Sequence, residues 1–232
     1  MKLYKLICAI LCAALVFTLA GCGGKTEPAS TPDVSSSAQG GSETDPSASS
    51  GEGSASGEGA DALVVYFSRT GEQYRVGVID KGNTAIVAEI IAAELGADLY
   101  EITPADDRYP TTYDELADYA KQEQRDGARP AYVKNVPDLS RYDTVFIGAP
   151  VWWGDWPMIM YSFFEGEDLS GKTLVPFSTH EGSGLSGFDR KLASAVPGAQ
   201  VLEGLAIRGQ DCRNAQDDVK SSVREWLDGL GY

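Results

Sequence analysis

Short apolar runs alternate with amphipathic segments along residues 62–232 of this chain. The runs are rich in β-branched and aromatic residues and contain few polar positions, which is typical of strands buried on both faces. They predict strands at residues 62–67, 98–102, 143–148, 173–178 and 200–207, the last of them interrupted near Gly204. The segments between them have apolar positions at helical spacing and predict helices at residues 83–95, 113–124, 157–164, 185–195 and 214–230.

Strand and helix alternate five times, an order that predicts a parallel sheet with helices on both faces. The expected fold is therefore α/β, a doubly wound five-stranded parallel sheet in three α/β/α layers. Residues 62–232 have the right length for one such domain.

Residues 1–61 lack this alternation and fall into two parts. Lys2 and Lys5 precede an apolar run at residues 6–19, which is typical of a secretory signal and too short to span a membrane comfortably. The sequence Leu-Ala-Gly-Cys at residues 19–22 resembles the lipobox of bacterial lipoproteins. That resemblance implies cleavage before Cys22 and attachment of diacylglycerol to its thiol. The alternative is a plain signal peptide in which the cysteine is incidental.

The second part, residues 22–61, has no aromatic residue and consists mainly of Gly, Ser, Ala, Thr, Pro, Asp and Glu. Such a composition cannot bury a core, so we expect a disordered tether. A flexible coil of this length spans roughly 35 Å root-mean-square. With residues 1–21 as the signal peptide, these features predict a lipoprotein at the outer face of a bacterial cytoplasmic membrane.

The formal net charge is −15 at pH 7. This acidic balance argues against a nucleic-acid partner and against adhesion to anionic lipid, so the lipid anchor is the expected contact with the membrane. Cys8 and Cys12 leave with the signal peptide and Cys22 is the anchor, so Cys212 remains alone and no disulfide framework is expected. With His180 as the single histidine, no zinc site is expected either.

Two loops that follow predicted strands carry the strongest chemical signal. Residues 66–71 read Tyr-Phe-Ser-Arg-Thr-Gly and are completed by Gly-Asn-Thr at residues 82–84, where a helix is expected to begin. Hydroxyls and free backbone N–H groups at the start of a helix suit a phosphate. Residues 148–154 read Gly-Ala-Pro-Val-Trp-Trp-Gly and offer flat aromatic side chains to a planar ring. Because parallel strands end at one edge of the sheet, the two loops predict a flavin nucleotide site at a topological switch point.

Two other sequence patterns resemble known catalytic or binding motifs but lack the context that these motifs need. Residues 166–173 fit the P-loop pattern literally, but they precede a strand instead of following one and opening a helix. Residues 182–184 read Gly-Ser-Gly, yet the single histidine and the lack of a suitable Ser and Asp order argue against a hydrolase triad.

Four segments in this order resemble the flavodoxin-like family: residues 66–71, 82–84, 150–154 and 177–184, the last reading Phe-Ser-Thr-His-Glu-Gly-Ser-Gly. The resemblance covers nearly all of residues 62–232 and implies noncovalently bound FMN. It implies that the first loop holds the FMN phosphate and that the two later loops contact the isoalloxazine ring. The residues so assigned are Ser68, Arg69, Thr70, Gly71, Asn83 and Thr84 for the phosphate, and Pro150, Val151, Trp152, Trp153, Gly154, Thr179, His180, Gly182 and Gly184 for the ring.

The first loop departs from the family. Family members run from Thr-Gly directly into Asn-Thr, whereas here residues 72–81 intervene. Either both arms still meet around the phosphate and the insertion loops outward, which we favour because both arms are intact, or one arm is displaced. His180 also has two interpretations: a surface-loop residue, or a group that acts at the flavin edge or on a substrate proton. No catalytic residue is assigned.

The resemblance implies a redox flavoprotein whose chemistry belongs to the cofactor. The favoured function is electron transfer at the cell surface, with a redox partner protein or a small-molecule acceptor such as a quinone. An FMN-dependent oxidoreductase that uses NAD(P)H or a protein donor is the second interpretation, although no dinucleotide fingerprint follows a strand. A lipoprotein that keeps the fold without the cofactor is the third.

Overall fold

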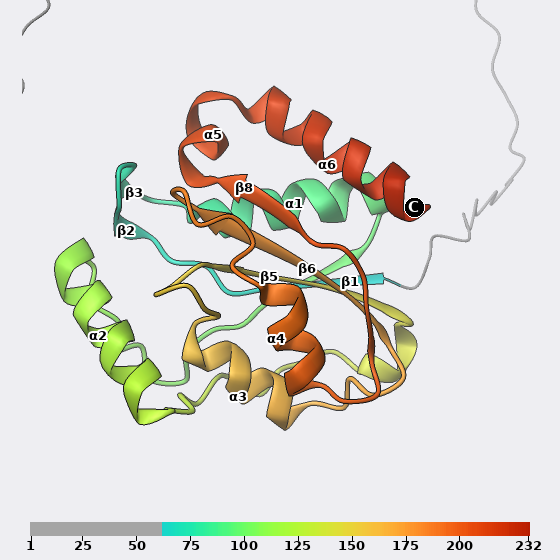
Figure 1. The fold of residues 1–232 in the computed structure, drawn as a ribbon, viewed down its shortest axis with the longest axis horizontal. Helices are drawn as coiled ribbons and strands as arrows, with labels where there is room; N and C mark the ends of the chain where they lie inside the picture. Colours follow the sequence, from blue (N-terminus) through green and yellow to red (C-terminus); the bar gives the residue numbers. More distant parts are fainter. Residues whose placement is uncertain (1–61) are drawn as a thin grey trace, which may run out of the picture. The chain divides into compact units, whose positions relative to one another are not determined.

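The computed structural model describes residues 62–232. The expected signal peptide, the expected lipidation site Cys22 and the expected tether at residues 22–61 lie outside the described residues. A central parallel sheet has the strand order β4-β1-β5-β6-β7, and β8 also pairs with β6 (Figure 1). Its strands are β1 (Ala62–Tyr66), β4 (Asp98–Glu101), β5 (Thr144–Pro150), β6 (Thr173–His180), β7 (Gln200–Val201) and β8 (Leu205–Arg208).

Helices cover both faces of this sheet, which confirms the predicted three-layer, doubly wound fold (Figure 1). One face carries α1 (Asn83–Leu95), α5 (Gly209–Asn214) and α6 (Gln216–Leu230), and the other carries α3 (Met158–Gly166) and α4 (Phe188–Ala195). The helix α2 (Tyr113–Asp126) stands near the carboxyl ends of the strands, and a 3₁₀ turn at Leu139–Arg141 precedes β5. Within residues 62–232, no helix combines the length and the apolar character that a membrane span requires.

The strand β1 shows why the sequences of the strands are apolar at nearly every position. All five of its residues are buried. Leu63 and Val65 pack in the core under α3 and α4, whereas Val64 and Tyr66 pack in the core under α1 and α6. Because side chains alternate between the two faces, a strand with a core on each side must be apolar at nearly every position.

The predicted strand at residues 200–207 is two short strands, β7 and β8, which pair with the beginning and the end of β6. Pro176 of β6 lies opposite the gap between them and lacks the N–H that a partner strand would need there. Gly204 lies in the gap, and a Cβ at this position would sit 2.7 Å from the Pro176 carbonyl oxygen. The interruption near Gly204 therefore has its physical cause in β6.

The predicted helix at residues 214–230 is also divided. Its main part, α6, begins at Gln216, and α5 precedes it from Gly209. Ala215 lies between them with φ −144° and ψ 46°, which is outside the helical region. At the start of α5, the Gln210 N–H donates to the Glu181 carboxylate at 2.8 Å, a contact with a distant loop that no local sequence pattern indicates.

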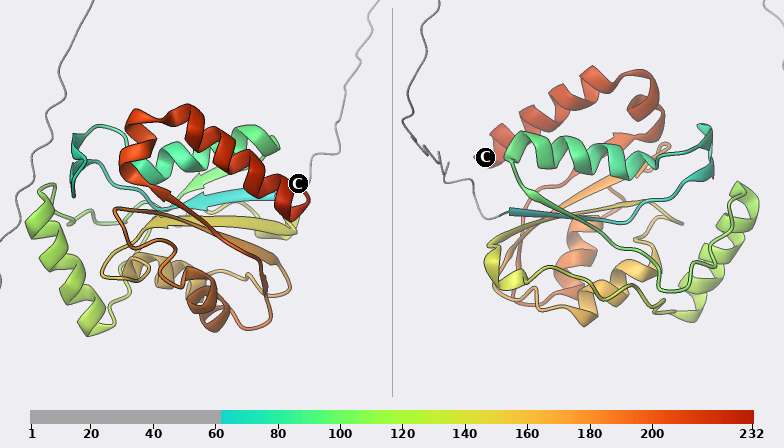
Figure 2. Two further views of the ribbon diagram at one scale, coloured as in Figure 1. Left: turned by 45° about the horizontal axis from the view of Figure 1, so that its top comes forward. Right: turned by 180° about the vertical axis from the view of Figure 1, so that it is seen from behind.

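The insertion at residues 72–81 forms most of a hairpin, β2 (Gly71–Gln73) and β3 (Gly77–Ile79), which extends toward α2 (Figure 2). The Glu72 N–H donates to the Thr111 carbonyl at 2.8 Å, and the Glu72 carboxylate accepts the Tyr113 N–H at 3.0 Å. The Tyr74 ring stacks on the Tyr113 ring with the centroids 5.2 Å apart. The insertion therefore loops outward from the sheet and holds the first turn of α2.

Candidate functional site

A cavity of about 300 Å³ opens at the carboxyl edge of the sheet. Its walls come from the loops after β5 and β6, from the hairpin, from α2 and from the first residues of α1 and α5. The lining residues are Pro150, Val151, Trp152, Trp153, Thr179, His180, Glu181, Ser183, Glu72, Gln73, Tyr74, Val76, Tyr113, Leu116, Ala117, Ala120, Asn83 and Gly209. The structure thus brings both predicted ring loops and one residue of the predicted phosphate loop to a common space.

The phosphate loop has its two arms in contact despite the insertion. Gly82 is the N-cap of α1 and has no side chain of its own to cap the helix. The Ser68 Oγ accepts the Ala85 N–H at 3.1 Å, which ties the first arm to the second. Among residues 62–232, the N–H groups of Asn83 and Thr84 have no acceptor. These N–H groups lie at the positive end of a 13-residue helix and can donate to an anion.

Gly82 makes the close approach of the two arms possible. A Cβ at this position would lie 2.0 Å from the Ser68 Oγ and 2.7 Å from the Arg69 carbonyl oxygen. Neither distance is compatible with a carbon atom, so any side chain at residue 82 would force the arms apart. The glycine therefore keeps the backbone donors of both arms together.

Two predicted phosphate ligands have other partners in the structure. The Arg69 guanidinium binds the Asp107 carboxylate at 2.6 Å and the Tyr109 carbonyl at 3.0 Å, and it does not line the cavity. The Thr84 hydroxyl lies 2.7 Å from the Thr179 hydroxyl, and both side chains are buried. Thr84 therefore offers its backbone N–H, while its hydroxyl joins α1 to β6.

A different arginine lies beside the first residue of α1. The Arg213 Nε donates to the Asn83 Oδ1 at 3.0 Å, and another guanidinium nitrogen donates to the Lys81 carbonyl. Sequence reasoning does not find Arg213, because it reaches α1 only through the fold of α5. The Arg213 side chain therefore places a positive charge next to the N–H groups at the start of α1.

The loop after β5 is a tight turn that sends its two tryptophans in different directions. Trp152 and Asp155 exchange two backbone hydrogen bonds of 2.9 Å, and Trp153 and Gly154 have φ of 51° and 71°. Two central residues with positive φ are typical of a type I′ turn. The Trp152 ring packs edge-on against Phe67, with centroids 5.5 Å apart.

Trp153 points outward and reaches α2. Its Nε1–H donates to the Ala117 carbonyl at 2.7 Å. The Lys121 ammonium lies 4.0 Å from the centre of its ring, a cation–π contact. Trp153 therefore connects the turn after β5 to α2 and closes one side of the cavity.

The loop after β6 places His180 at the cavity wall. The His180 Nδ1 accepts the Gly182 N–H at 2.9 Å, so the proton of the neutral ring lies on Nε2. Burial lowers the pKa of His180, which favours this neutral form. Gly182 and Gly184, with φ of 126° and 60°, give the loop its sharp curvature. His180 thus presents one N–H donor that no side chain or carbonyl of residues 62–232 accepts.

Glu181 also lines the cavity, and the sequence analysis did not assign it to the site. One carboxylate oxygen accepts the Gln210 N–H at 2.8 Å. The other is buried and has no hydrogen-bond partner among residues 62–232, although Arg208 lies 3.7 Å away. A buried carboxylate oxygen without a donor costs free energy unless a ligand supplies one. At the cavity wall, Glu181 therefore pairs with the Arg208 charge and holds the start of α5 through Gln210.

Residues 62–228 match the family described as flavodoxin. A candidate flavoprotein from Bacteroides eggerthii is 32% identical, with a TM-score of 0.59, and the match covers 75% of this chain and 99% of that chain. A candidate flavoprotein from Bacteroides uniformis is 31% identical, with a TM-score of 0.58 and coverage of 72% and 99%.

A more distant structure has the same fold. A flavoprotein from Lactobacillus acidophilus NCFM, in complex with FMN, is 19% identical, with a TM-score of 0.54 and coverage of 72% of this chain and 98% of that chain. No curated protein matches this chain.

Proposed function

Because the chain belongs to the flavodoxin family, we propose that residues 62–232 bind FMN and that the protein transfers electrons at the outer face of a bacterial cytoplasmic membrane. The observation that carries the proposal is the cavity shared by the loops after β5 and β6, with the free N–H groups of α1 at its margin. FMN supplies reversible one- and two-electron transfer when it is bound.

The donors and acceptors of the cavity fit the three parts of FMN. A phosphate needs donors, and Asn83 and Thr84 offer backbone N–H groups next to the Arg213 charge. The ribityl chain carries hydroxyls, and the polar residues Asn83, Glu181 and Ser183 line the cavity. An isoalloxazine ring needs a flat apolar surface, and Trp152 lines the cavity after β5.

The chain's own residues would bind the cofactor and shield it. The N–H of His180 would donate to the ring edge or to an acceptor beside it, because the Gly182 contact fixes its proton on Nε2. The hairpin and α2 form further walls of the cavity, with Tyr74 stacked on Tyr113. These walls would limit the access of water to the ring.

The proposed location rests on residues 1–61. A charged start, an apolar run and the lipobox-like sequence ending at Cys22 together support a lipid anchor. The acidic charge of the chain supports a mode of attachment that does not depend on anionic lipid.

Cofactor binding is tested by titrating the purified full chain with FMN and with riboflavin in a calorimeter. We expect one FMN per chain and weaker binding of riboflavin, because riboflavin lacks the phosphate that the first turn of α1 would bind. A chain that gives no heat with FMN and shows no flavin absorbance would contradict the proposal and support a lipoprotein without a cofactor.

A second candidate function is a reductase for a small planar acceptor. It is favoured by the extension of the cavity beyond the ring loops to the Tyr74 and Tyr113 rings. Anaerobic stopped-flow with NADPH separates the two functions. For an electron carrier we expect slow bleaching of the flavin, whereas bleaching at roughly 1–10³ per second, the usual range of enzyme turnover, would establish the reductase.

A further inference from the structure

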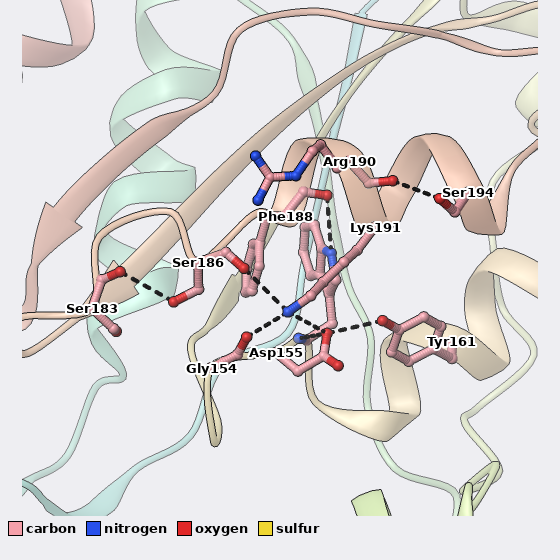
Figure 3. Close-up of polar contacts among 10 residues, drawn as sticks. Gly154, Asp155, Tyr161, Ser183, Ser186, Phe188, Arg190, Lys191 and Ser194 are labelled. Carbon is pink, nitrogen blue, oxygen red and sulfur yellow. Dashed lines mark hydrogen bonds and ion pairs between the residues drawn. The ribbon is translucent and has the colours of Figure 1, made fainter.

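Lys191 of α4 lies between the two ring loops (Figure 3). Its ammonium donates to the Gly154 carbonyl, in the turn after β5, and to the Ser186 carbonyl at 3.1 Å, in the loop after β6. It also lies 3.2 Å from the Asp155 carboxylate. An ammonium group has three donors, and these three acceptors use all of them.

The Asp155 carboxylate extends this contact to α3. The same oxygen that faces Lys191 accepts the Trp156 N–H at 2.8 Å and the Tyr161 hydroxyl at 2.9 Å (Figure 3). Lys191 and Asp155 are 33% and 23% exposed, so solvent screens the pair only in part. One lysine thus joins both loops to the helices that follow them.

The separation of the two loops is fixed at two levels. At the sheet, the Val151 N–H donates to the Thr179 carbonyl at 2.9 Å, which continues the pairing of β5 with β6. Beyond the sheet, the Lys191 ammonium joins Gly154 to Ser186. Deeper in the core, the Trp156 Nε1–H donates to the Phe188 carbonyl at 3.2 Å and the two rings stack, so Lys191 adds the link between the outermost residues of the two loops.

We propose that Lys191 is a positioning residue that holds the two ring loops at the separation a flavin requires before the cofactor binds. This inference rests on the proposed function, because it takes the space between these loops as the ring site. Preorganised loops lose less conformational entropy on binding, so the lysine would raise the affinity for FMN without touching it.

The experiment compares Lys191→Met with Lys172→Met in the full chain. Lys172 is a matched control, because its ammonium also donates to two carbonyls, Leu139 at 2.7 Å and Tyr142 at 2.8 Å, at the opposite edge of the sheet. The readouts are the Kd for FMN, the free energy of unfolding, and amide hydrogen exchange without FMN at residues 151–156 and 183–188.

We expect Lys191→Met to raise the Kd for FMN about tenfold, the scale of one charge-assisted hydrogen bond, and to speed exchange in both loops. Lys191→Arg should restore part of the affinity, because it keeps a charged donor. Lys172→Met should lower the free energy of unfolding about as much as Lys191→Met does. It should leave the Kd for FMN and the amide exchange of the two loops unchanged.

Either of two Kd results would overturn the inference: equal Kd values for wild type and Lys191→Met, or an equal rise in Kd for both lysine variants. Unchanged loop exchange in Lys191→Met without FMN would also overturn it, even if the wild type failed to bind FMN. Absence of FMN binding by the wild type is a separate outcome that contradicts the proposed function itself.

Discussion

Gly82 allows the two arms of the proposed phosphate loop to lie in contact. The substitution Gly82→Ala places a carbon 2.0 Å from the Ser68 Oγ, so the two arms of the phosphate loop must separate. We expect this overpacking to weaken FMN binding by about 1–3 kcal/mol, with a smaller effect on riboflavin. Titration calorimetry with both ligands measures the difference. Gly229→Ala is the control, because a Cβ there meets no atom within 4 Å. Equal losses for FMN and riboflavin would refute the phosphate assignment.

Glu123 of α2 is a buried carboxyl whose ionisation opposes folding. Burial raises the pKa of Glu123, and the hydrogen bond from the Tyr109 hydroxyl at 3.2 Å offsets this only in part. Because the pKa of Glu123 is higher in the folded state than in the unfolded state, its carboxyl group contributes to stability when it is protonated. The contribution is complete below the unfolded pKa of about 4.3 and is lost as the pH rises through the pKa of the folded state.

The variant Glu123→Gln keeps an acceptor for Tyr109 and removes the charge. We therefore expect a larger free energy of unfolding than wild type at pH 8, and no gain at pH 4, where the native carboxyl is protonated. Urea denaturation at the two pH values tests this, with the exposed Glu225→Gln as control. A gain of the same size at both pH values would show that ionisation is not the cause.

Among the elements, α1 and β1 could be predicted from sequence because their patterns are local. The predicted helix at residues 83–95 has those bounds in the structure, ended by Gly96 with φ 63°. The division of the fifth strand and the start of α5 could not be predicted in full. They depend on Pro176 and Glu181, which come from other parts of the chain.

In the candidate site, too, some parts could be predicted from local sequence and others could not. Both ring loops and Asn83 follow strand ends or open a helix, so their sequence positions indicate where they lie. The cavity wall formed by α2 could not be predicted, because it depends on how this polar helix packs against the hairpin and the turn after β5. Its sequence has only a few apolar positions to indicate a buried face, among them Leu116, Ala117 and Ala120, which line the cavity.

The two tryptophans after β5 should have separate effects on α2 and on the cofactor. Trp153→Ala removes the hydrogen bond to Ala117 and the Lys121 contact, so we expect faster amide exchange in α2. Trp152→Ala should weaken FMN binding by about 1–3 kcal/mol, the scale of base–aromatic stacking. Trp226→Ala, which removes a similar bond to the Glu203 carbonyl, is the control. Identical effects of the first two variants would contradict this division.

For the whole molecule, membrane attachment should depend on one thiol. We expect Cys22→Ala to block lipidation and to leave uncleaved precursor or soluble protein, because two acyl chains give stable anchoring. Membrane fractionation and the intact mass of the protein test this, with Cys212→Ser as the control for loss of a thiol. Unchanged fractionation and mass in Cys22→Ala would rule out the lipoprotein assignment.

Both ends of the described chain lie at the amino edge of the sheet. Ala62 begins β1, and the Tyr232 hydroxyl lies 2.9 Å from the Thr144 Oγ1 at the start of β5 (Figure 1). The cavity is at the carboxyl edge, one strand length away, about 16 Å for five residues. A domain immobilised on an electrode through either end would thus keep the cavity face toward the solution. An acceptor could reach that face without meeting the support.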